Sequence, residues 1–128
     1  MRERLGRRDR GAAAVEFALL LPVLMLFIFG IIDFGRMVNA KITINEAARE
    51  GARAAAILGV PQGHDRIDDV VAGMDVGKSV TGCADPDDPN ANATATVTHE
   101  FHFITPINVI AGLGETTLEA TGVMPCLQ

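Results

Sequence analysis

The fold is decided by the stretch Gly11-Ala12-Ala13-Ala14-Val15-Glu16-Phe17-Ala18-Leu19-Leu20-Leu21-Pro22, which opens an apolar segment that continues to Ile32. From Phe17 to Ile32 the chain has no charged residue, and twelve of these sixteen residues are Leu, Ile, Val or Phe. At about 1.5 Å of rise per residue, a helix from Gly11 to Ile32 reaches about 33 Å, enough to cross a hydrocarbon core of about 30 Å. We therefore expect a transmembrane helix over residues 12–35.

Glu16 is the charged residue inside this segment. The large apolar residues contribute about −4 to −7 kcal/mol to insertion, and one carboxyl group opposes insertion by at most about 3 kcal/mol. Insertion is therefore favoured, but it does not explain why a carboxylate stands there. Residues 1–10 carry five Arg against two acidic residues. This basic leader, residues 1–11, predicts a cytoplasmic N-terminus and an extracytoplasmic C-terminal part.

Three interpretations of the segment remain open. A secretory signal would be cut after Val38-Asn39-Ala40, although Asp33 and Arg36 interrupt the apolar run before that point. A plain membrane anchor would leave the carboxylate without a role. In the third interpretation the leader is cut after Gly11, so that the free amine of Ala12 on one subunit pairs with Glu16 of a neighbour in a medium of low dielectric constant.

Three blocks occur in order along the chain: Gly11 to Pro22, then Gly30-Ile31-Ile32-Asp33-Phe34-Gly35-Arg36, then Ala47-Ala48-Arg49-Glu50-Gly51-Ala52-Arg53. Over residues 10–58 the chain resembles the TadE-like family of pilus assembly proteins. These are minor pseudopilins of the tight-adherence (Flp) apparatus, a branch of the type IV pilin-like proteins. Residues beyond 60 resemble no family that we recognise.

The resemblance implies specific roles and partners. A dedicated prepilin peptidase would cut the bond between Gly11 and Ala12, and Glu16 with Phe17 would serve recognition during assembly. The sixth mature position is Phe17, where Tyr is common in the major pilins, so the ring is kept and the hydroxyl is lost. The helix would lie in the lipid of the bacterial inner membrane, and the other partners would be pilin or pseudopilin subunits.

We expect the helix to continue as an amphipathic extension over residues 36–59 and to stop near Pro61. Ala47, Gly51 and Ala55 form a stripe of small side chains, which would pack either on the sheet of the same domain or on another subunit. Charged residues at helical spacing predict two ion pairs on another stripe, Glu46 with Arg49 and Glu50 with Arg53.

Residues 60–128 predict a small extracytoplasmic α+β domain with antiparallel strands. Apolar spacing predicts a short helix over 64–74, and alternation predicts strands over 76–84, 94–104 and 116–124. Outside the cytoplasm, a disulfide is the first expectation for the two cysteines, Cys83 and Cys126.

Several functions are disfavoured by composition. Residues 54–128 carry ten acidic and two basic residues, a net charge near −8, which disfavours nucleic-acid binding. His99 and His102 are three apart on an expected strand and make a poor metal pair. The acidic stretch Asp85 to Asn90 lacks the EF-hand spacing, so a solvated loop is favoured over a calcium site.

The sequence therefore favours a non-catalytic structural subunit with no catalytic residues, no cofactor, no metal and no small-molecule substrate. The alternative is a single-span membrane-anchored extracytoplasmic binding or accessory domain with no pilus role.

Overall fold

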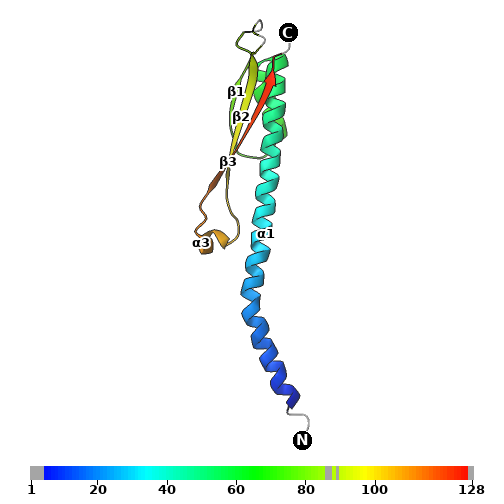
Figure 1. Ribbon diagram of the computed structural model, residues 1–128, viewed down its shortest axis with the longest axis vertical. Coiled ribbons are helices and arrows are strands. Elements are labelled where there is room, and N and C mark those ends of the chain that lie inside the picture. The colour runs from blue at the N-terminus through cyan, green and yellow to red at the C-terminus, as the bar shows by residue number, and fades with distance from the viewer. Residues whose placement is uncertain (1–4, 86–87, 89, 127–128) are drawn as a thin grey trace. The chain divides into compact units, whose positions relative to one another are not determined.

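The computed structural model describes residues 5–85, 88 and 90–126. Its elements follow the order α1 (Leu5–Leu58), α2 (Val60–Val70), β1 (Gly77–Thr81), β2 (Asn92–Phe101), α3 (Ile107–Ala111) and β3 (Thr116–Pro125) (Figure 1). A long N-terminal helix followed by a small antiparallel sheet confirms the α+β prediction.

The chain forms two compact units. Unit 1 comprises Met1–Phe34 and Phe103–Leu113, and unit 2 comprises Gly35–His102 and Gly114–Gln128. Helix α1 contributes its N-terminal part to unit 1 and its C-terminal part to unit 2.

The sheet of unit 2 has the order β1-β2-β3, and both neighbouring pairs are antiparallel. Along β2 the buried residues alternate with less buried ones, because successive side chains of a strand point to opposite faces. Val97 occupies the middle of this pattern, opposite Lys78 of β1 and Ala120 of β3. The predicted strands lie within a few residues of the observed ones, and β2 ends at Phe101, before the expected Ile104.

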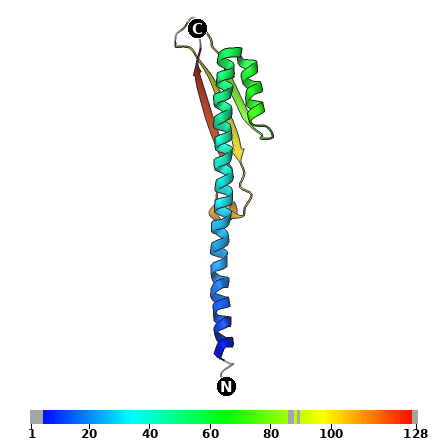
Figure 2. The same cartoon turned by 90° about the vertical axis from the view of Figure 1, so that its right-hand side faces the viewer.

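The core of unit 2 lies where the C-terminal part of α1 meets α2 and the sheet. Its members are almost inaccessible to solvent, and most are small: Ile44, Ala47, Ala48, Ala52, Ile67, Val71, Ala95, Val97 and Ala120. Figure 2 shows α2 beside the C-terminal end of α1. Burying these apolar side chains is the main source of stability for this unit.

The turn from α1 to α2 depends on Gly59, whose φ of 106° is a conformation that side chains disfavour. We expected Pro61 to stop the first helix and the next helix to begin near His64. Instead, Pro61 lies in the first turn of α2, which already starts at Val60. Proline is accepted there because the N–H groups of a first turn have no partner within the helix.

Cys83 and Cys126 are joined by a disulfide, with their Cα atoms 6.0 Å apart. The two cysteines lie just beyond β1 and β3, and the N–H of Cys126 also donates to the carbonyl oxygen of Ala91 at 3.0 Å. The expected cysteine pair is thus brought together at the ends of two strands of unit 2.

Candidate functional site

The N-terminal part of α1 carries the residues expected to take part in processing and assembly. Gly11, Ala12, Glu16 and Phe17 are all exposed on this helix, and Phe17 keeps 60% of its surface accessible. Within the residues that the structure describes, no group forms an ion pair with Glu16. The exposed position of Glu16 on α1 leaves its carboxylate accessible from outside this chain.

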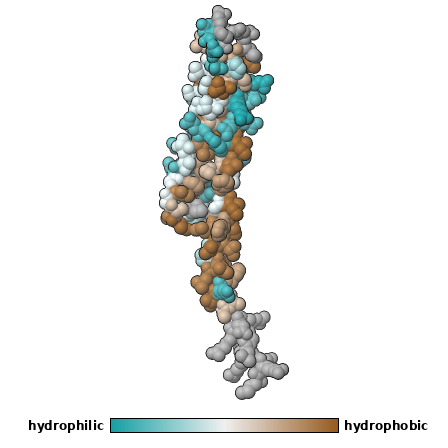
Figure 3. Space-filling model, in the orientation of Figure 1, coloured by the Kyte–Doolittle hydropathy of each residue, from teal (hydrophilic) through white to brown (hydrophobic). Residues whose placement is uncertain are grey.

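The apolar side chains around Glu16 are exposed as well. Leu19 and Ile31 are each 72% accessible, and Figure 3 shows apolar residues in brown along the N-terminal part of α1. So much uncovered apolar surface is unfavourable in water. The described helix from Gly11 to Leu58 is long and apolar enough to be a candidate membrane span.

The bond between Gly11 and Ala12 lies inside α1, which begins at Leu5. A Cβ added to Gly11 would have no atom within 4 Å, so nothing in the described chain packs against this position. A peptidase that needs an extended substrate must first unwind the helix here. Glycine helps, because it destabilises a helix by about 1 kcal/mol relative to alanine.

Asp33, at the end of the apolar run, is buried within unit 1 and is 2% exposed. Its Oδ1 accepts a hydrogen bond from the backbone N–H of Ile104 at 3.3 Å. Its Oδ2 accepts one from the backbone N–H of Thr105 at 3.3 Å and another from the Thr105 hydroxyl. The resemblance includes Asp33 as part of a sequence block, but the sequence did not indicate this contact, whose partners are about seventy residues away.

Arg36, in the same sequence block, makes its contacts within unit 2. A guanidinium N–H donates to the carbonyl oxygen of His102 at 3.4 Å, and the guanidinium carbon lies 5.2 Å from the centre of the Phe101 ring. Such a cation–π contact contributes about 0.5–1 kcal/mol at an exposed site. Arg36 thus holds the end of β2 against α1.

The small-residue stripe of α1 packs within the chain. Ala47, Gly51 and Ala55 are buried, and a Cβ added to Gly51 would lie 2.5 Å from Cγ1 of Ile67 on α2. A Cβ added to Gly63 of α2 would lie 3.0 Å from the Cβ of Ala55. In the structure, helix α2 of the same chain packs against Gly51 and Ala55. This partner is neither the sheet of the same domain nor another subunit, the two partners that the sequence left open.

The expected ion pairs along α1 are replaced by one to α2. Glu50 pairs with Arg66 at 3.7 Å, and Arg66 also lies 3.9 Å from Asp69. Neither Glu46 with Arg49 nor Glu50 with Arg53 forms an ion pair in the described part of the chain. Packing of α2 against α1 brings Arg66 within reach of Glu50. All of these groups are well exposed, so their contribution to stability is small.

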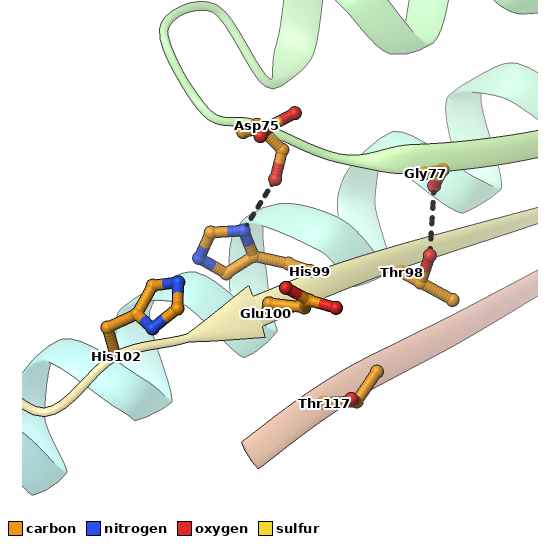
Figure 4. A pocket seen from close by; sticks show the side chains of 7 residues that line it. All are labelled: Asp75, Gly77, Thr98, His99, Glu100, His102 and Thr117. Carbon is orange, nitrogen blue, oxygen red and sulfur yellow. Dashed lines mark hydrogen bonds between the residues drawn. The ribbon is translucent and has the colours of Figure 1, made fainter. Parts of the chain in front are cut away.

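Unit 2 also has an open hollow of about 410 Å³ at the end of the sheet (Figure 4). It is lined by Asp75, Gly77, Thr98, His99, Glu100, His102 and Thr117. His99 donates from Nδ1 to the Asp75 carbonyl oxygen at 2.8 Å, and Nδ1 of His102 lies 3.2 Å from Oε1 of Glu115. Both histidines line one hollow because β2 ends at Phe101, so His102 no longer follows the alternation assumed from sequence.

Over residues 5–85, 88 and 90–126, no group of three or more His, Cys, Asp or Glu side chains could hold a metal ion. Of the acidic stretch considered for calcium, Pro86, Asp87 and Pro89 lie outside the described residues. Within that stretch, Oδ1 of Asp88 accepts a hydrogen bond from the N–H of Asn90 at 2.9 Å.

Comparison with known proteins gives one family match. The family model described as TadE-like protein matches residues 11–53, which confirms the resemblance over the first part of the chain. No curated protein and no solved structure matches the chain. The matched residues include the Gly11–Ala12 bond, Glu16, Asp33, Arg36 and the small-residue stripe as far as Arg53.

Proposed function

We propose that this chain is a minor pseudopilin-like membrane subunit that takes part in assembly of a tight-adherence (Flp, type IV-like) pilus or of its secretion apparatus. The observation that carries the proposal is the family match over residues 11–53, with Glu16 as the fifth residue after the Gly11–Ala12 bond. The exposure of that carboxylate on an apolar helix supports the same assignment, and no ion pair to it forms within the described part of the chain.

In this proposal the protein is a single-pass protein of the bacterial inner membrane. Helix α1 crosses the bilayer through its exposed apolar part, and the basic leader remains in the cytoplasm because positively charged flanks are retained on that side. The sheet and α2 are then extracytoplasmic. That location agrees with the disulfide between Cys83 and Cys126, since disulfides persist in oxidising compartments.

Glu16 is assigned an assembly contact. After a prepilin peptidase cuts the chain, Ala12 carries a free α-ammonium group, and a neighbouring pilin or pseudopilin subunit presents its own carboxylate. The attraction between them is strong in a low-dielectric medium, where an unpaired charge is costly. A carboxylate that is exposed along a membrane-spanning helix therefore favours association with such a partner.

The role is structural, and we propose no catalytic residue, cofactor, small-molecule substrate or nucleic acid. The net charge near −8 of residues 54–128 disfavours phosphate-bearing polymers. The hollow beside His99 is open. The side chains of Thr98 and His99 in its lining are hydrogen-bonded to the backbone carbonyl oxygens of Gly77 and Asp75.

The test is Edman sequencing of the protein extracted from membranes of a piliated host, followed by an assembly assay. We expect a mature start at Ala12. Glu16→Gln should still be cut but should no longer enter the assembled complex, and Glu46→Gln, an exposed carboxylate elsewhere on α1, serves as the matched control. An uncut chain with a Glu16→Gln variant that functions normally would overturn the proposal in favour of a membrane-tethered binding domain.

A further inference from the structure

The segment 103–113, called the apolar loop below, exposes large aliphatic side chains. Val109 is 82% exposed, Ile110 69%, Ile104 67% and Leu113 48%. No residue from Phe103 to Gly114 is charged. Exposed aliphatic residues grouped in this way mark a surface that contacts a partner or a lipid phase.

The apolar loop belongs to unit 1 together with the apolar part of α1. The Asp33 carboxylate accepts hydrogen bonds from the backbone N–H groups of Ile104 and Thr105, each at 3.3 Å. Asp33 is the first charged residue after the uncharged run from Phe17 to Ile32. The start of the apolar loop is therefore tethered to α1 directly after the uncharged run of the helix.

The chain then turns back within a few residues. Helix α3 covers Ile107–Ala111, and Gly112 ends it with φ of 64°, after which β3 begins at Thr116. Helix α3 belongs to the same unit as the N-terminal part of α1. Figure 3 shows apolar residues on this loop and on the neighbouring N-terminal part of α1. The apolar loop thus reverses the direction of the chain within a few residues and carries aliphatic side chains at its tip.

We propose that the apolar loop inserts into the outer interface of the same membrane that α1 crosses, so that the protein contacts lipid at two places. The occupant is the boundary between lipid headgroups and acyl chains. Three observations favour lipid: the tether to Asp33 at the end of the span, the absence of charge over the loop, and the continuity of its apolar surface with α1. The inference rests on the membrane placement of α1 proposed above, but not on the pilus role.

The loop is too short to cross a bilayer, but its size suits the interface. Amphipathic segments that lie in this region bury their apolar side by about 5–10 Å. Helix α3 has five residues, which at a rise of about 1.5 Å per residue gives a length of about 7.5 Å, within this range. Thr105, hydrogen-bonded to Asp33, would mark the aqueous edge of the inserted part.

The chain contains no Trp, which permits a direct test with single-Trp variants of the full protein. Val109→Trp reports on the loop. Phe27→Trp, at a position 64% exposed in the span, reports on α1, and Val123→Trp, at a position 59% exposed on β3, is the matched control outside unit 1. Each variant is reconstituted in vesicles of phosphatidylcholine and phosphatidylglycerol that contain lipids brominated near the headgroup end or near the end of the acyl chain.

We expect the indole at position 109 to show blue-shifted emission and to lose most of its fluorescence to shallow bromines, while remaining protected from iodide. The indole at position 123 should be quenched by iodide and little affected by bromines. Equal iodide quenching at positions 109 and 123, with bromine quenching at position 27 intact, would overturn the inference and leave the span in place.

Two further outcomes would also overturn it. Loss of bromine quenching at position 27 as well would show that α1 is not in the membrane, which refutes the placement on which the inference rests. Protection of position 109 from both quenchers, relieved when the protein is diluted with lipid, would identify a second protein copy as the occupant.

Discussion

Asp33 and Thr105 lie 72 residues apart in sequence and are joined by two hydrogen bonds, because the buried carboxylate accepts from both the backbone N–H and the hydroxyl of Thr105. The backbone N–H of Ile104 donates a third hydrogen bond, so the carboxylate accepts from three donors. Asp33 lies within the segment matched by the TadE-like family model, whereas Thr105 lies outside it. Through these hydrogen bonds, Asp33 ties a later segment of the chain to α1 at the end of the uncharged run of the helix.

Replacement of this carboxylate should release the apolar loop. Asp33→Asn keeps the shape, but it replaces one acceptor oxygen with an N–H₂ group that cannot accept a hydrogen bond. Since a buried donor left without a partner costs about 1–3 kcal/mol, we expect residues 103–113 to open more often. Hydrogen–deuterium exchange of the detergent-solubilised protein should show faster exchange at Ile104 and Thr105.

Two substitutions at Thr105 distinguish the hydrogen bond donated by its hydroxyl from the one donated by its backbone N–H. Thr105→Ser keeps the hydroxyl and should behave like the native protein, whereas Thr105→Val should accelerate exchange by a smaller amount than Asp33→Asn does. Unchanged exchange at Ile104 in Asp33→Asn would contradict the assigned contact.

Close packing makes two glycines intolerant of a methyl group. A Cβ at Gly122 would lie 2.2 Å from the backbone oxygen of Ala48, and a Cβ at Gly51 would lie 2.5 Å from Cγ1 of Ile67. A side chain can shift more readily than backbone. We therefore expect Gly51→Ala to lower the free energy of unfolding by about 1–3 kcal/mol, and Gly122→Ala to lower it by more. Urea titration followed by circular dichroism measures both.

Gly35→Ala is the matched control on α1, because a Cβ there would meet no atom within 4 Å. This change should be neutral, or should stabilise the helix by up to about 1 kcal/mol. A double variant with Ile67→Val should recover part of the loss in Gly51→Ala. If Gly51→Ala and Gly35→Ala had the same stability, the packing described for α2 would be incorrect.

The disulfide should stabilise unit 2. Cys83 and Cys126 are separated by 43 residues, and closing a loop of that size contributes about 4 kcal/mol in the chain-entropy model. We expect reduction to lower the urea midpoint of unit 2 by a corresponding amount. The Cys83→Ser/Cys126→Ser variant should match the reduced protein and should not respond to reductant. Two thiols alkylated without reductant in the native protein would argue against the bridge.

Much of the fold follows from local patterns. The spacing of Ala47, Gly51 and Ala55 predicts a buried side of α1, and the alternation around Val97 predicts a half-buried strand. The length and apolar character of the segment from Phe17 to Ile32 indicate the candidate span. Each of these signals is contained within a few turns of helix or a single strand, so the sequence is enough to recognise it.

The contacts that sequence analysis missed are all between distant segments. Glu50 has Arg53 within reach on its own helix, yet it pairs with Arg66 because α2 packs alongside. The sequence shows Asp33 as the first charged residue after an apolar run. Its hydrogen-bond partners, Ile104 and Thr105, depend on the path that the chain takes after β2. Sequence analysis also did not predict that residues 103–113 group with the N-terminal part of α1. The uncharged stretch from Phe103 to Gly114 could have indicated an apolar segment, but not which part of the chain it joins.

Processing of the leader should depend on the size of the residue at position 11. Gly11 lies on an exposed stretch of helix with no atom near its missing Cβ, so the folded chain itself imposes no restriction there. Gly11→Leu should therefore leave folding and membrane insertion unchanged. A peptidase that requires a small residue before the cut should fail to process it. We expect an uncut precursor, seen as a band of higher mass on immunoblots of membrane fractions and confirmed by Edman sequencing.

Ala18→Leu adds similar bulk at an exposed position of the same helix and should still be cut to a mature start at Ala12. Normal cleavage of Gly11→Leu at Ala12 would refute a size requirement at this site, and loss of cleavage in both variants would trace the defect to added bulk on the helix in general.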